Sequence, residues 1–528
     1  MNLVEDLALP VLVLAPLVVS VWLLVADRVG PPPRPGASRG LAVLAAVLVA
    51  AAAVVVVWRR PGLEFTWIES LGVQIDLGVD GLSAPFVLLT GLMAVVATLV
   101  PYHDPLTDAR ARGPGQPEKT EPMDVEGGLP VPRSLATYYA CLLVVVGGSL
   151  LTFLTRDALV FFVAFEMVLV PMWVLVARHG DATTRADRDG AAMRFLLFTA
   201  TGSMLMLIGI LALWGATGTT DLTRWADLAG SSLDGGTQVI VAVILLIGLG
   251  IKVPVWPLHT WLPWVHATAP TAGSVLLAAV LLKMGAYGMI RLVAAPLPGG
   301  LAAAAPVLAG LAVTGILWAG LACLVERDLK RLIAWASIGH LGFVVLAIAA
   351  GTETGLQAAV YGNMAHGLIS ALLFVLVGSL KHQWGGADLA TARAALREVS
   401  PRLGFALVLG MAAAMGLPGL AGFWGEWGAI YASWAPGPGR TEGWFRFFAV
   451  LAALGAVLAV AYAVRVLREV WAGDRRSPAI RDVRGAELGV LVVLGVGIVA
   501  LGVYPVALLD LTAPAVEGII AHLGVVGR

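Results

Sequence analysis

The chain has 528 residues, of which 59% are hydrophobic and only 13% are charged, and its mean hydropathy is +0.89. A soluble domain averages about 25% charged residues, so this chain has too few polar groups to cover a globular surface and is predicted to be a membrane protein. Its 34 basic and 34 acidic residues cancel, which removes any argument from net charge for binding to nucleic acid.

Fourteen runs are long and apolar enough to form transmembrane helices, which need about 20 mostly apolar residues. In chain order they cover approximately residues 8–26, 41–58, 83–101, 135–154, 157–177, 191–215, 238–256, 268–292, 303–324, 329–350, 356–381, 402–431, 444–467 and 486–508. The first run follows Glu5 and Asp6 rather than Lys or Arg, unlike a signal peptide, so we expect it to remain as a membrane helix. The prediction is an all-α integral membrane protein.

Two segments between the second and fourth runs are not membrane helices. Residues 63–79 alternate weakly between apolar and polar, which predicts a short hairpin outside the bilayer. Residues 103–133 are rich in Pro, Gly and acids and are predicted to form a loop.

Sequence motifs for cofactors are missing. Cys141 and Cys323, the only cysteines, both lie in apolar runs, so a disulfide framework, a thiolate zinc site and an iron–sulfur cluster all lack ligands. The chain also contains no G-x-x-x-x-G-K-[ST] phosphate loop. We therefore expect no cofactor on this chain, and energy for transport must come from a partner or an ion gradient.

The loops on one side of the predicted bundle carry 24 Lys and Arg residues, whereas the opposite loops and both termini carry 8. Under the positive-inside rule the basic side is cytoplasmic. Both termini are then predicted to lie outside, as an even number of spans requires.

The two remaining basic residues, Lys252 and Lys283, fall within predicted spans, although 29 of the 34 basic residues are Arg. A desolvated Lys can exchange a proton and Arg cannot, so Lys suits a proton relay. Glu166 and Glu426 are acids deep in the fifth and twelfth runs. A charge at the bilayer centre costs about 2.5–3.5 kcal/mol, so such groups usually face a bundle interior or water. We interpret the four as a proton path; static ion pairs or snorkelling side chains are the alternative.

Four histidines need separate treatment. His340 and His366 lie within spans, where a single buried His is as often a packing residue as a relay member, so their neighbours decide between the two. His259 and His266 are seven residues apart with no nearby Cys or carboxylate, so we expect helix-end hydrogen bonds rather than zinc binding.

The seventh and twelfth runs are interrupted, by Pro254 and Pro257 and by the sequence Gly-Leu-Pro-Gly at 416–419. Proline opens the helix ladder, which a bilayer tolerates where the freed groups line a cavity or are buried in protein. The two runs are five spans apart and cross in opposite directions, so spans 4–8 and 9–13 are predicted to form two inverted five-helix repeats, as in transporters.

The predicted organisation of the chain follows from these repeats. It comprises N-terminal helices with loops, a first repeat, a second repeat, and a last helix with a tail, at residues 1–134, 135–292, 303–467 and 468–528.

The stretch GIKVPVWPLHTWLPWVHATAPTAGSVLLAAVLLKMGAYGMIR resembles the core signature of the antiporter-like subunits of respiratory complex I, which cation/proton antiporters and membrane-bound hydrogenases share. The resemblance covers most of the chain, through GVDGLSAPFVLLT, RDLKRLIAWASIGHLGFV, NMAHGLISALLF and GFWGEW. A Glu in the broken twelfth helix is typical of the M-type (chain 4 type) subunit, where the L-type and N-type subunits generally have Lys. Glu426 therefore favours the M-type subunit.

The resemblance implies a proton relay of six acids, lysines and histidines: Glu166, Lys252, Lys283, His340, His366 and Glu426. In this scheme the first two form a coupling pair whose separation changes the proton affinity of the lysine. The second lysine passes the proton to the centre, the histidines relay it across, and the last Glu stands at the exit side. Two positions depart from the family, which usually has an acid where this chain has Trp264 and commonly a Lys where it has Arg194.

The function implied by the resemblance is proton translocation in an NADH:quinone oxidoreductase, driven by quinone reduction in neighbouring subunits, with no redox centre on this chain. The implied partners are L-type and N-type antiporter-like subunits, protons, water and the lipid bilayer of a bacterial inner membrane. Quinone acts only through the complex, and nucleic acid is not expected. The alternatives are a subunit of a cation/proton antiporter, a subunit of a membrane-bound hydrogenase, and a scaffold for assembly.

Overall fold

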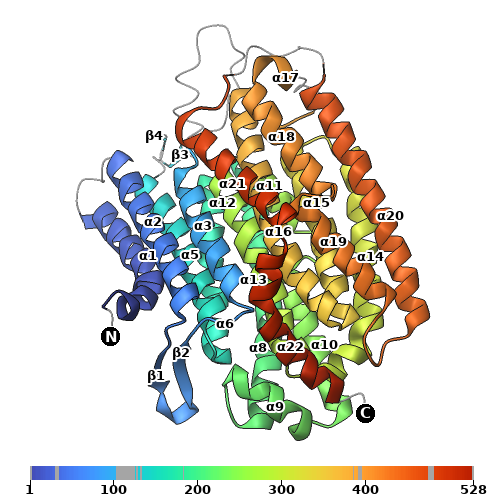
Figure 1. The fold of residues 1–528 in the computed structure, drawn as a ribbon. Coiled ribbons are helices and arrows are strands. Elements are labelled where there is room, and N and C mark those ends of the chain that lie inside the picture. Colours follow the sequence, from blue (N-terminus) through green and yellow to red (C-terminus); the bar gives the residue numbers. More distant parts are fainter. Residues whose placement is uncertain are drawn as a thin grey trace.

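The computed structural model of the chain describes residues 3–29, 35–102, 125–126, 129–130, 134–181, 184–384, 386–389, 395–473 and 481–525. Its helices run side by side in one broad bundle, with α1 (Leu3–Val29) and α2 (Pro35–Arg59) at one edge and α20 (Glu442–Val466) at the other (Figure 1). We name the two ends of this bundle by what lies there. The hairpin end carries strands β1 (Leu63–Ile68) and β2 (Val73–Leu77), and the α17 end carries α17 (Leu396–Val399).

Twelve segments among the described residues are long and apolar enough to cross a membrane. Besides α1, α2 and α20 with its π-helical extension η4 (Leu467–Trp471), they are α5 (Leu135–Leu154), α6 with α7 (Ala158–Met167 and Leu169–His179), α8 (Arg185–Thr217), α10 (Gly235–Lys252), the composite helix from α12 to η3, α14 (Pro298–Val325), α15 (Leu329–Ala350), α16 (Glu353–Trp384) and α21 (Gly485–Val503). Two shorter apolar helices, α3 (Ala84–Leu99) and α18 (Pro401–Ala414), lie at the third and twelfth predicted runs. The prediction of a helical membrane protein is confirmed.

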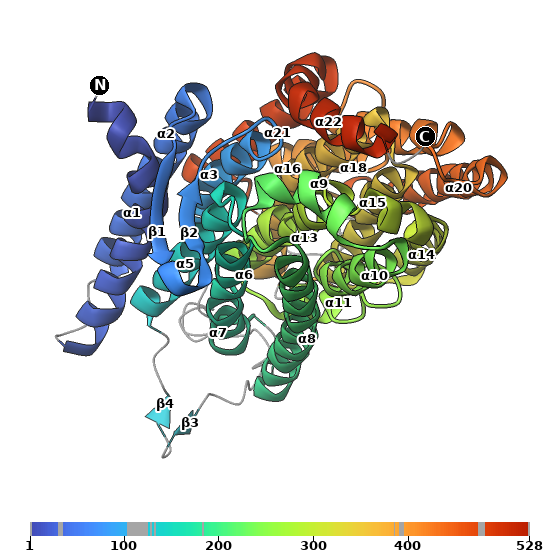
Figure 2. The same cartoon turned by 90° about the horizontal axis from the view of Figure 1, so that it is seen from below.

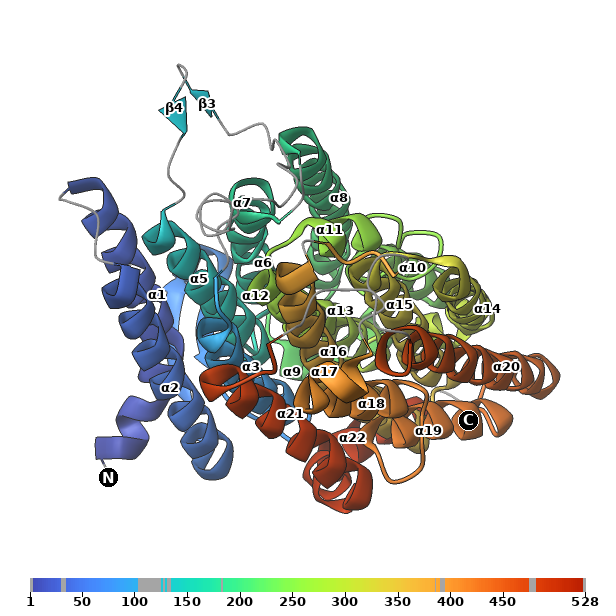
Figure 3. The same cartoon turned by 90° about the horizontal axis from the view of Figure 1, so that it is seen from above.

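The most enclosed helix of the bundle is α16. The whole of its most apolar stretch is buried, whereas only a third of the corresponding stretch in α20 is. Helices α13 (Leu282–Gly288), α15, α18 and α19 (Ala421–Trp434) all pack on α16, and the end-on views place it inside the bundle (Figures 2 and 3). A helix that is apolar on all sides belongs in such a position. Polar side chains within this buried stretch of α16 therefore contact other helices and not lipid.

Proline and glycine interrupt three of the long helices. Pro171 has no N–H for the carbonyl four residues earlier, that of Met167, and α6 ends at Met167. Helix α10 ends at Lys252, two residues before Pro254, and the chain resumes as the short helix α11 (Leu262–Thr268). The twelfth predicted run divides into α18 and α19 at Gly416 and Gly419, whose φ angles of 70° and 90° suit glycine alone among common residues.

Strands β1 and β2 pair antiparallel, so the hairpin predicted for residues 63–79 is confirmed. The loop predicted for residues 103–133 lies outside the described residues except for two short paired strands, β3 (Val125–Glu126) and β4 (Leu129–Pro130). Helix α1 begins and the last described helix, α22 (Val506–Val525), ends toward the hairpin end of the bundle (Figure 1).

Two helices at the hairpin end were not predicted. Helix α9 (Leu222–Ser232) lies between α8 and α10, and α22 (Val506–Val525) forms where the sequence analysis expected only a tail (Figure 2). The apolar pattern of α22 is interrupted by Asp510, Pro514 and Glu517, so its sequence lacks the run of about 20 apolar residues that predicts a transmembrane helix.

Candidate functional site

Lys283 lies at the centre of the bundle on α13, within a long helix that contains two π-helical segments. Two π-helical segments, η2 (Leu277–Leu281) and η3 (Met289–Ala294), flank α13, and α12 (Thr271–Leu276) precedes them. Such segments occur frequently at functional sites, because they leave carbonyls outside the normal helical ladder. The Lys283 side chain is fully buried, and its Nζ donates to Ala278 O at 2.8 Å and to Nδ1 of His366.

Three further titratable residues extend from Lys283 across neighbouring helices. His366 on α16 is buried, and its ring centre lies 5.9 Å from that of His340 on α15. His340 Nδ1 donates to Oε1 of Glu426 on α19 at 2.8 Å. We call these residues the central chain: Lys283, His366, His340 and Glu426. It joins four helices that are up to 143 residues apart in the sequence.

A cavity of about 20 Å³ lies along the central chain and is lined by His340, His366 and Glu426 together with Gly362, Gly422 and Gly425. Nε2 of His340 and Nε2 of His366 are both buried and have no hydrogen-bond partner among the described residues. Buried polar groups of this kind are normally satisfied by water, and a cavity of this size holds one. The two imidazoles are therefore positioned to exchange a proton through water.

Glu426 lies against the break between α18 and α19. A Cβ atom added to Gly416 would stand 2.8 Å from Oε2 of Glu426, so only glycine lets the backbone approach this carboxylate so closely. The interruption of the twelfth run, which the Gly-Leu-Pro-Gly sequence predicted, thus lies beside this carboxylate.

Glu166 and Lys252 are held differently. Lys252, at the last position of α10, is buried, and its Nζ lies 4.8 Å from the centre of the Phe165 ring and 5.9 Å from that of Phe195. Glu166 acts on Lys252 electrostatically, but the two form no ion pair, and Lys252 has no hydrogen-bond partner among the described residues. The end of α10 packs tightly on α13, because a Cβ at Gly285 would lie 3.1 Å from Cβ of Lys252.

One polar cluster that sequence analysis missed lies at the α17 end. Asp181, which follows α7, accepts from Lys330 Nζ at 2.5 Å and from Lys381 Nζ at 2.8 Å. Lys330 is fully buried at the start of α15. Burial alone would raise the pKa of the Asp181 carboxyl, but the two lysines outweigh it and hold that pKa below its usual range. No local signal marks this end cluster, since its members are 149 and 200 residues apart in the chain.

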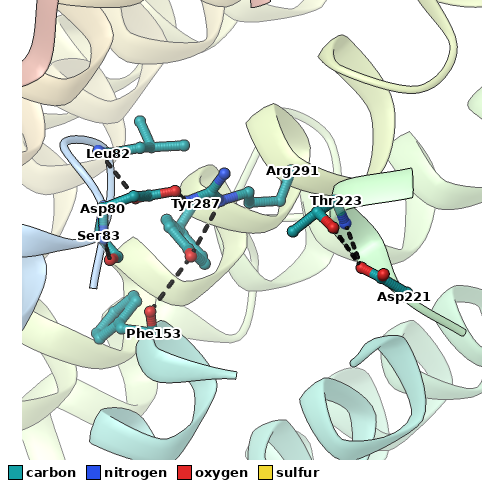
Figure 4. Close-up of polar contacts among 8 residues, drawn as sticks. All are labelled: Asp80, Leu82, Ser83, Phe153, Asp221, Thr223, Tyr287 and Arg291. Atoms are coloured by element: carbon teal, nitrogen blue, oxygen red, sulfur yellow. Dashed lines mark hydrogen bonds and ion pairs between the residues drawn. The ribbon is translucent and has the colours of Figure 1, made fainter. Parts of the chain in front are cut away.

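A second missed group lies at the hairpin end and is drawn in Figure 4. Arg291 on η3 pairs with Asp80, and its Nε donates to the hydroxyl of Tyr287 at 3.1 Å, which in turn donates to Phe153 O at 3.3 Å. Burial would raise the pKa of the Asp80 carboxyl, but the Arg291 charge outweighs it and lowers that pKa. The pair attaches the loop before α3 to the end of the helix that carries Lys283.

The two departures from the family pattern are in contact with each other. The Arg194 guanidinium lies 4.5 Å from the centre of the Trp264 ring, and that of Arg331 lies 5.0 Å from it. A cation–π contact of this kind contributes about 0.5–1 kcal/mol where it is exposed. Here it joins α8, α11 and α15.

Among the described residues, His259 and His266 included, no group of three His, Cys, Asp or Glu side chains is placed to hold a metal ion. The expected helix-end hydrogen bonds are wrong for His266. Its ring stacks on Phe374 with centres 4.5 Å apart, and neither ring nitrogen has a partner among the described residues.

Comparison with known proteins gives consistent matches. Residues 155–455 match the family described as NADH:quinone oxidoreductase/Mrp antiporter, transmembrane. NADH-quinone oxidoreductase subunit M of Pseudomonas aeruginosa is 32% identical over 465 residues, which are 87% of this chain and 84% of that protein. Subunit M of Escherichia coli is 31% identical over 465 residues, covering 86% and 84%. A chain of respiratory complex I from Thermus thermophilus is 27% identical with a TM-score of 0.80, covering 97% of this chain and 100% of that one.

Proposed function

The chain belongs to the NADH:quinone oxidoreductase/Mrp antiporter membrane family, and from this premise we propose that it is the M-type, proton-translocating membrane subunit of an NADH:quinone oxidoreductase. The observation that carries the proposal is the central chain. It sets Lys, His, His and Glu in sequence across the middle of the bundle, with a cavity along the two imidazoles. Each of these side chains can both take up and release a proton.

The proposed mechanism divides the six residues into two groups. Glu166 and Lys252 form the coupling pair, whose separation alters how firmly the lysine holds its proton. Lys283 receives the proton, His366 and His340 pass it on, and Glu426 releases it at the exit side. The absence of a direct Glu166–Lys252 ion pair supports this division, because the two charges act on each other without being locked together by a bond, so their separation can change.

The proposed architecture has fourteen crossings. Twelve of them would be the long segments. The short helix α3 would form the thirteenth crossing, and α18 and α19 together would form the fourteenth. Residues 135–292 and 303–467 would form the inverted repeats, between an N-terminal part at 1–134 and a C-terminal part at 468–528. The basic α17 end would face the cytoplasm of a bacterial cell and both termini the outer side of its inner membrane.

The proposed partners are other membrane subunits of the complex, with L-type and N-type antiporter-like neighbours. The energy comes from quinone reduction elsewhere in the complex, and this chain contributes no redox centre and carries no cofactor. A subunit of a cation/proton antiporter is the second candidate, because the family description includes the Mrp antiporters. Glu426 disfavours it, since the antiporters generally have Lys at that position.

The experiment that tests the proposal compares Lys252→Met and Glu166→Gln in the assembled complex. We expect both to abolish NADH-driven proton uptake by inverted membrane vesicles, because each removes one charge of the coupling pair. Unchanged pumping and turnover in both variants would contradict the proposal. Sodium-dependent pH change in vesicles that lack NADH dehydrogenase would favour the antiporter instead.

A further inference from the structure

The end cluster is bonded to the segment that follows His266. Asp181 N donates to Thr268 O at 2.8 Å, and Lys330 Nζ donates to Ala269 O at 2.9 Å. Asp181 and Lys381 keep 24% and 20% of their side-chain surface exposed, while Lys330 keeps none. The cluster therefore reaches solvent on one side and the buried end of α11 on the other.

His266 lies between this cluster and the central chain. From His266 the chain runs through α12 and η2 directly to α13 and Lys283, and the ring that His266 stacks on, Phe374, lies on α16 eight residues after His366. The charged groups that act on His266 are Lys330 from the end cluster and Lys283 from the central chain, and His266 in turn acts on His366. Lys330 lies on α15, Lys283 on α13 and His366 on α16, so three different helices bring these groups to His266.

The His266 ring is the kind of group that the interior of a bundle normally excludes. It is completely buried, and both of its nitrogens are without a partner among the described residues. A buried polar atom left unpaired costs about 1–3 kcal/mol, so Phe or Leu at this position would pack against Phe374 at less cost. An imidazole here needs a reason other than packing.

We propose that His266 carries protons between the end cluster and the Lys283–His366 contact, which makes the Asp181, Lys330 and Lys381 group the port where the relay exchanges protons with the α17 side. The inference rests on the proposed function and names its uptake route. In the step, a proton leaves the Lys330 ammonium and binds one nitrogen of His266, and the proton on the other nitrogen moves to the Lys283 amine. Lys330 regains a proton from solvent through the exposed side of the cluster, so the cluster keeps its charge. The positive charge gained is carried by Lys283, which returns to the amine when it passes the proton to His366.

The test uses matched substitutions in the assembled complex, with NADH-driven proton uptake by inverted vesicles divided by the rate of NADH oxidation. His266→Phe removes both nitrogens and keeps the stacking on Phe374. His259→Phe is the control, because His259 is buried on the same broken segment, packs on Trp335 at 5.4 Å, and has no lysine acting on it. Lys283→Met is the reference for a blocked relay.

We expect His266→Phe to lower the ratio to the level of Lys283→Met, while His259→Phe keeps the native ratio. If Lys283→Met lowers the ratio and His266→Phe does not, the inference is wrong and the proposed function stands. If neither lowers it, the proposed function fails as well. If the complex with His266→Phe does not assemble, His266→Gln is used instead. Gln keeps a polar side chain at this site but cannot exchange a proton near neutral pH. A native ratio in His266→Gln overturns the inference.

Discussion

The two lysines inside the bundle, Lys252 and Lys283, have opposite surroundings. Lys283 is bonded directly to a carbonyl and to the imidazole of His366. Lys252 faces the rings of Phe165 and Phe195, and its acid, Glu166, is near enough to act on it but not to bond it. A hydrogen-bonded lysine has a route for its proton. A lysine against aromatic rings can respond only through its charge. In the proposed mechanism, Lys283 therefore passes protons on, whereas Lys252 responds to the charge of Glu166.

Local backbone structure produces this difference. Lys252 is the last residue of α10, and its side chain packs on the rings of Phe165 and Phe195 and bonds no carbonyl among the described residues. Lys283 lies two residues after the end of the π-helical segment η2, and its Nζ donates to the carbonyl of Ala278 within that segment. Single substitutions at or beside either lysine can therefore test this difference.

The largest effect is expected from Lys283→Met, which removes the first member of the central chain. A positioned proton carrier contributes about 10²–10⁴-fold to transfer, and we expect translocation through this subunit to fall by a factor in that range. Proton uptake by vesicles containing the assembled complex measures it. Lys283→Arg should not restore pumping, since Arg keeps its proton; restored pumping would mean that charge alone suffices at this position.

The next effect concerns the end cluster, where lysines are paired directly with an acid. Asp181→Asn leaves the fully buried Lys330 without its carboxylate, and we expect a loss of about 3–5 kcal/mol in stability near neutral pH. Thermal unfolding of the detergent-solubilised complex measures it, with Asp187→Asn on the exposed start of α8 as the matched control.

The same variant has a defined pH dependence. The pKa of the Asp181 carboxyl is lowered in the folded chain, so the ionised group stabilises the fold fully above its unfolded pKa of about 3.9. That stabilisation is lost as the pH falls through the lower, folded pKa. The difference in melting temperature between native and Asp181→Asn should therefore shrink below about pH 4. A constant difference in melting temperature across that range would show that the negative charge of Asp181 does not stabilise the folded chain.

A smaller effect is expected from Phe165→Leu, which removes one of the two aromatic rings beside Lys252. A desolvated cation–π contact contributes about 0.5–2 kcal/mol, so removing the ring against Lys252 should change the pumping rate by about thirtyfold or less. Phe161→Leu, one turn earlier on α6 and not in contact with Lys252, is the control, and an equal effect of both substitutions would indicate a packing change instead.

The smallest effect is expected from Gly416→Ala. Its φ of 70° strains any residue with a Cβ, by about 1–2 kcal/mol, and the added methyl group would stand 2.8 Å from Oε2 of Glu426. We expect a slight loss of thermal stability together with slower pumping. Gly419→Ala, with φ of 90° but open space around it, should lower stability without slowing proton release.

Much of the fold could be predicted from the sequence. The helical runs, the hairpin and the break around Gly416 follow from hydropathy, alternation and glycine or proline placement, all of which act over a few residues. Helix α22 was missed because its two acids and Pro514 interrupt the apolar pattern, although its outer position tolerates them. Four of the six candidate relay residues also came from sequence, since a charge inside an apolar run is visible without any structure. The two histidines, His340 and His366, were included only because the family resemblance implied them.

The sequence by itself determined that this chain is a bundle of membrane helices with a few titratable groups inside, because the bilayer imposes length and polarity on each segment separately. Only the tertiary structure decided which of these groups meet. It bonded Lys283 to His366 and His340 to Glu426, kept Glu166 from bonding Lys252, and brought Asp181 to two lysines more than a hundred residues away. The physical reason is that hydropathy fixes the depth of a residue along its helix, whereas its neighbours depend on how helices pack around α16.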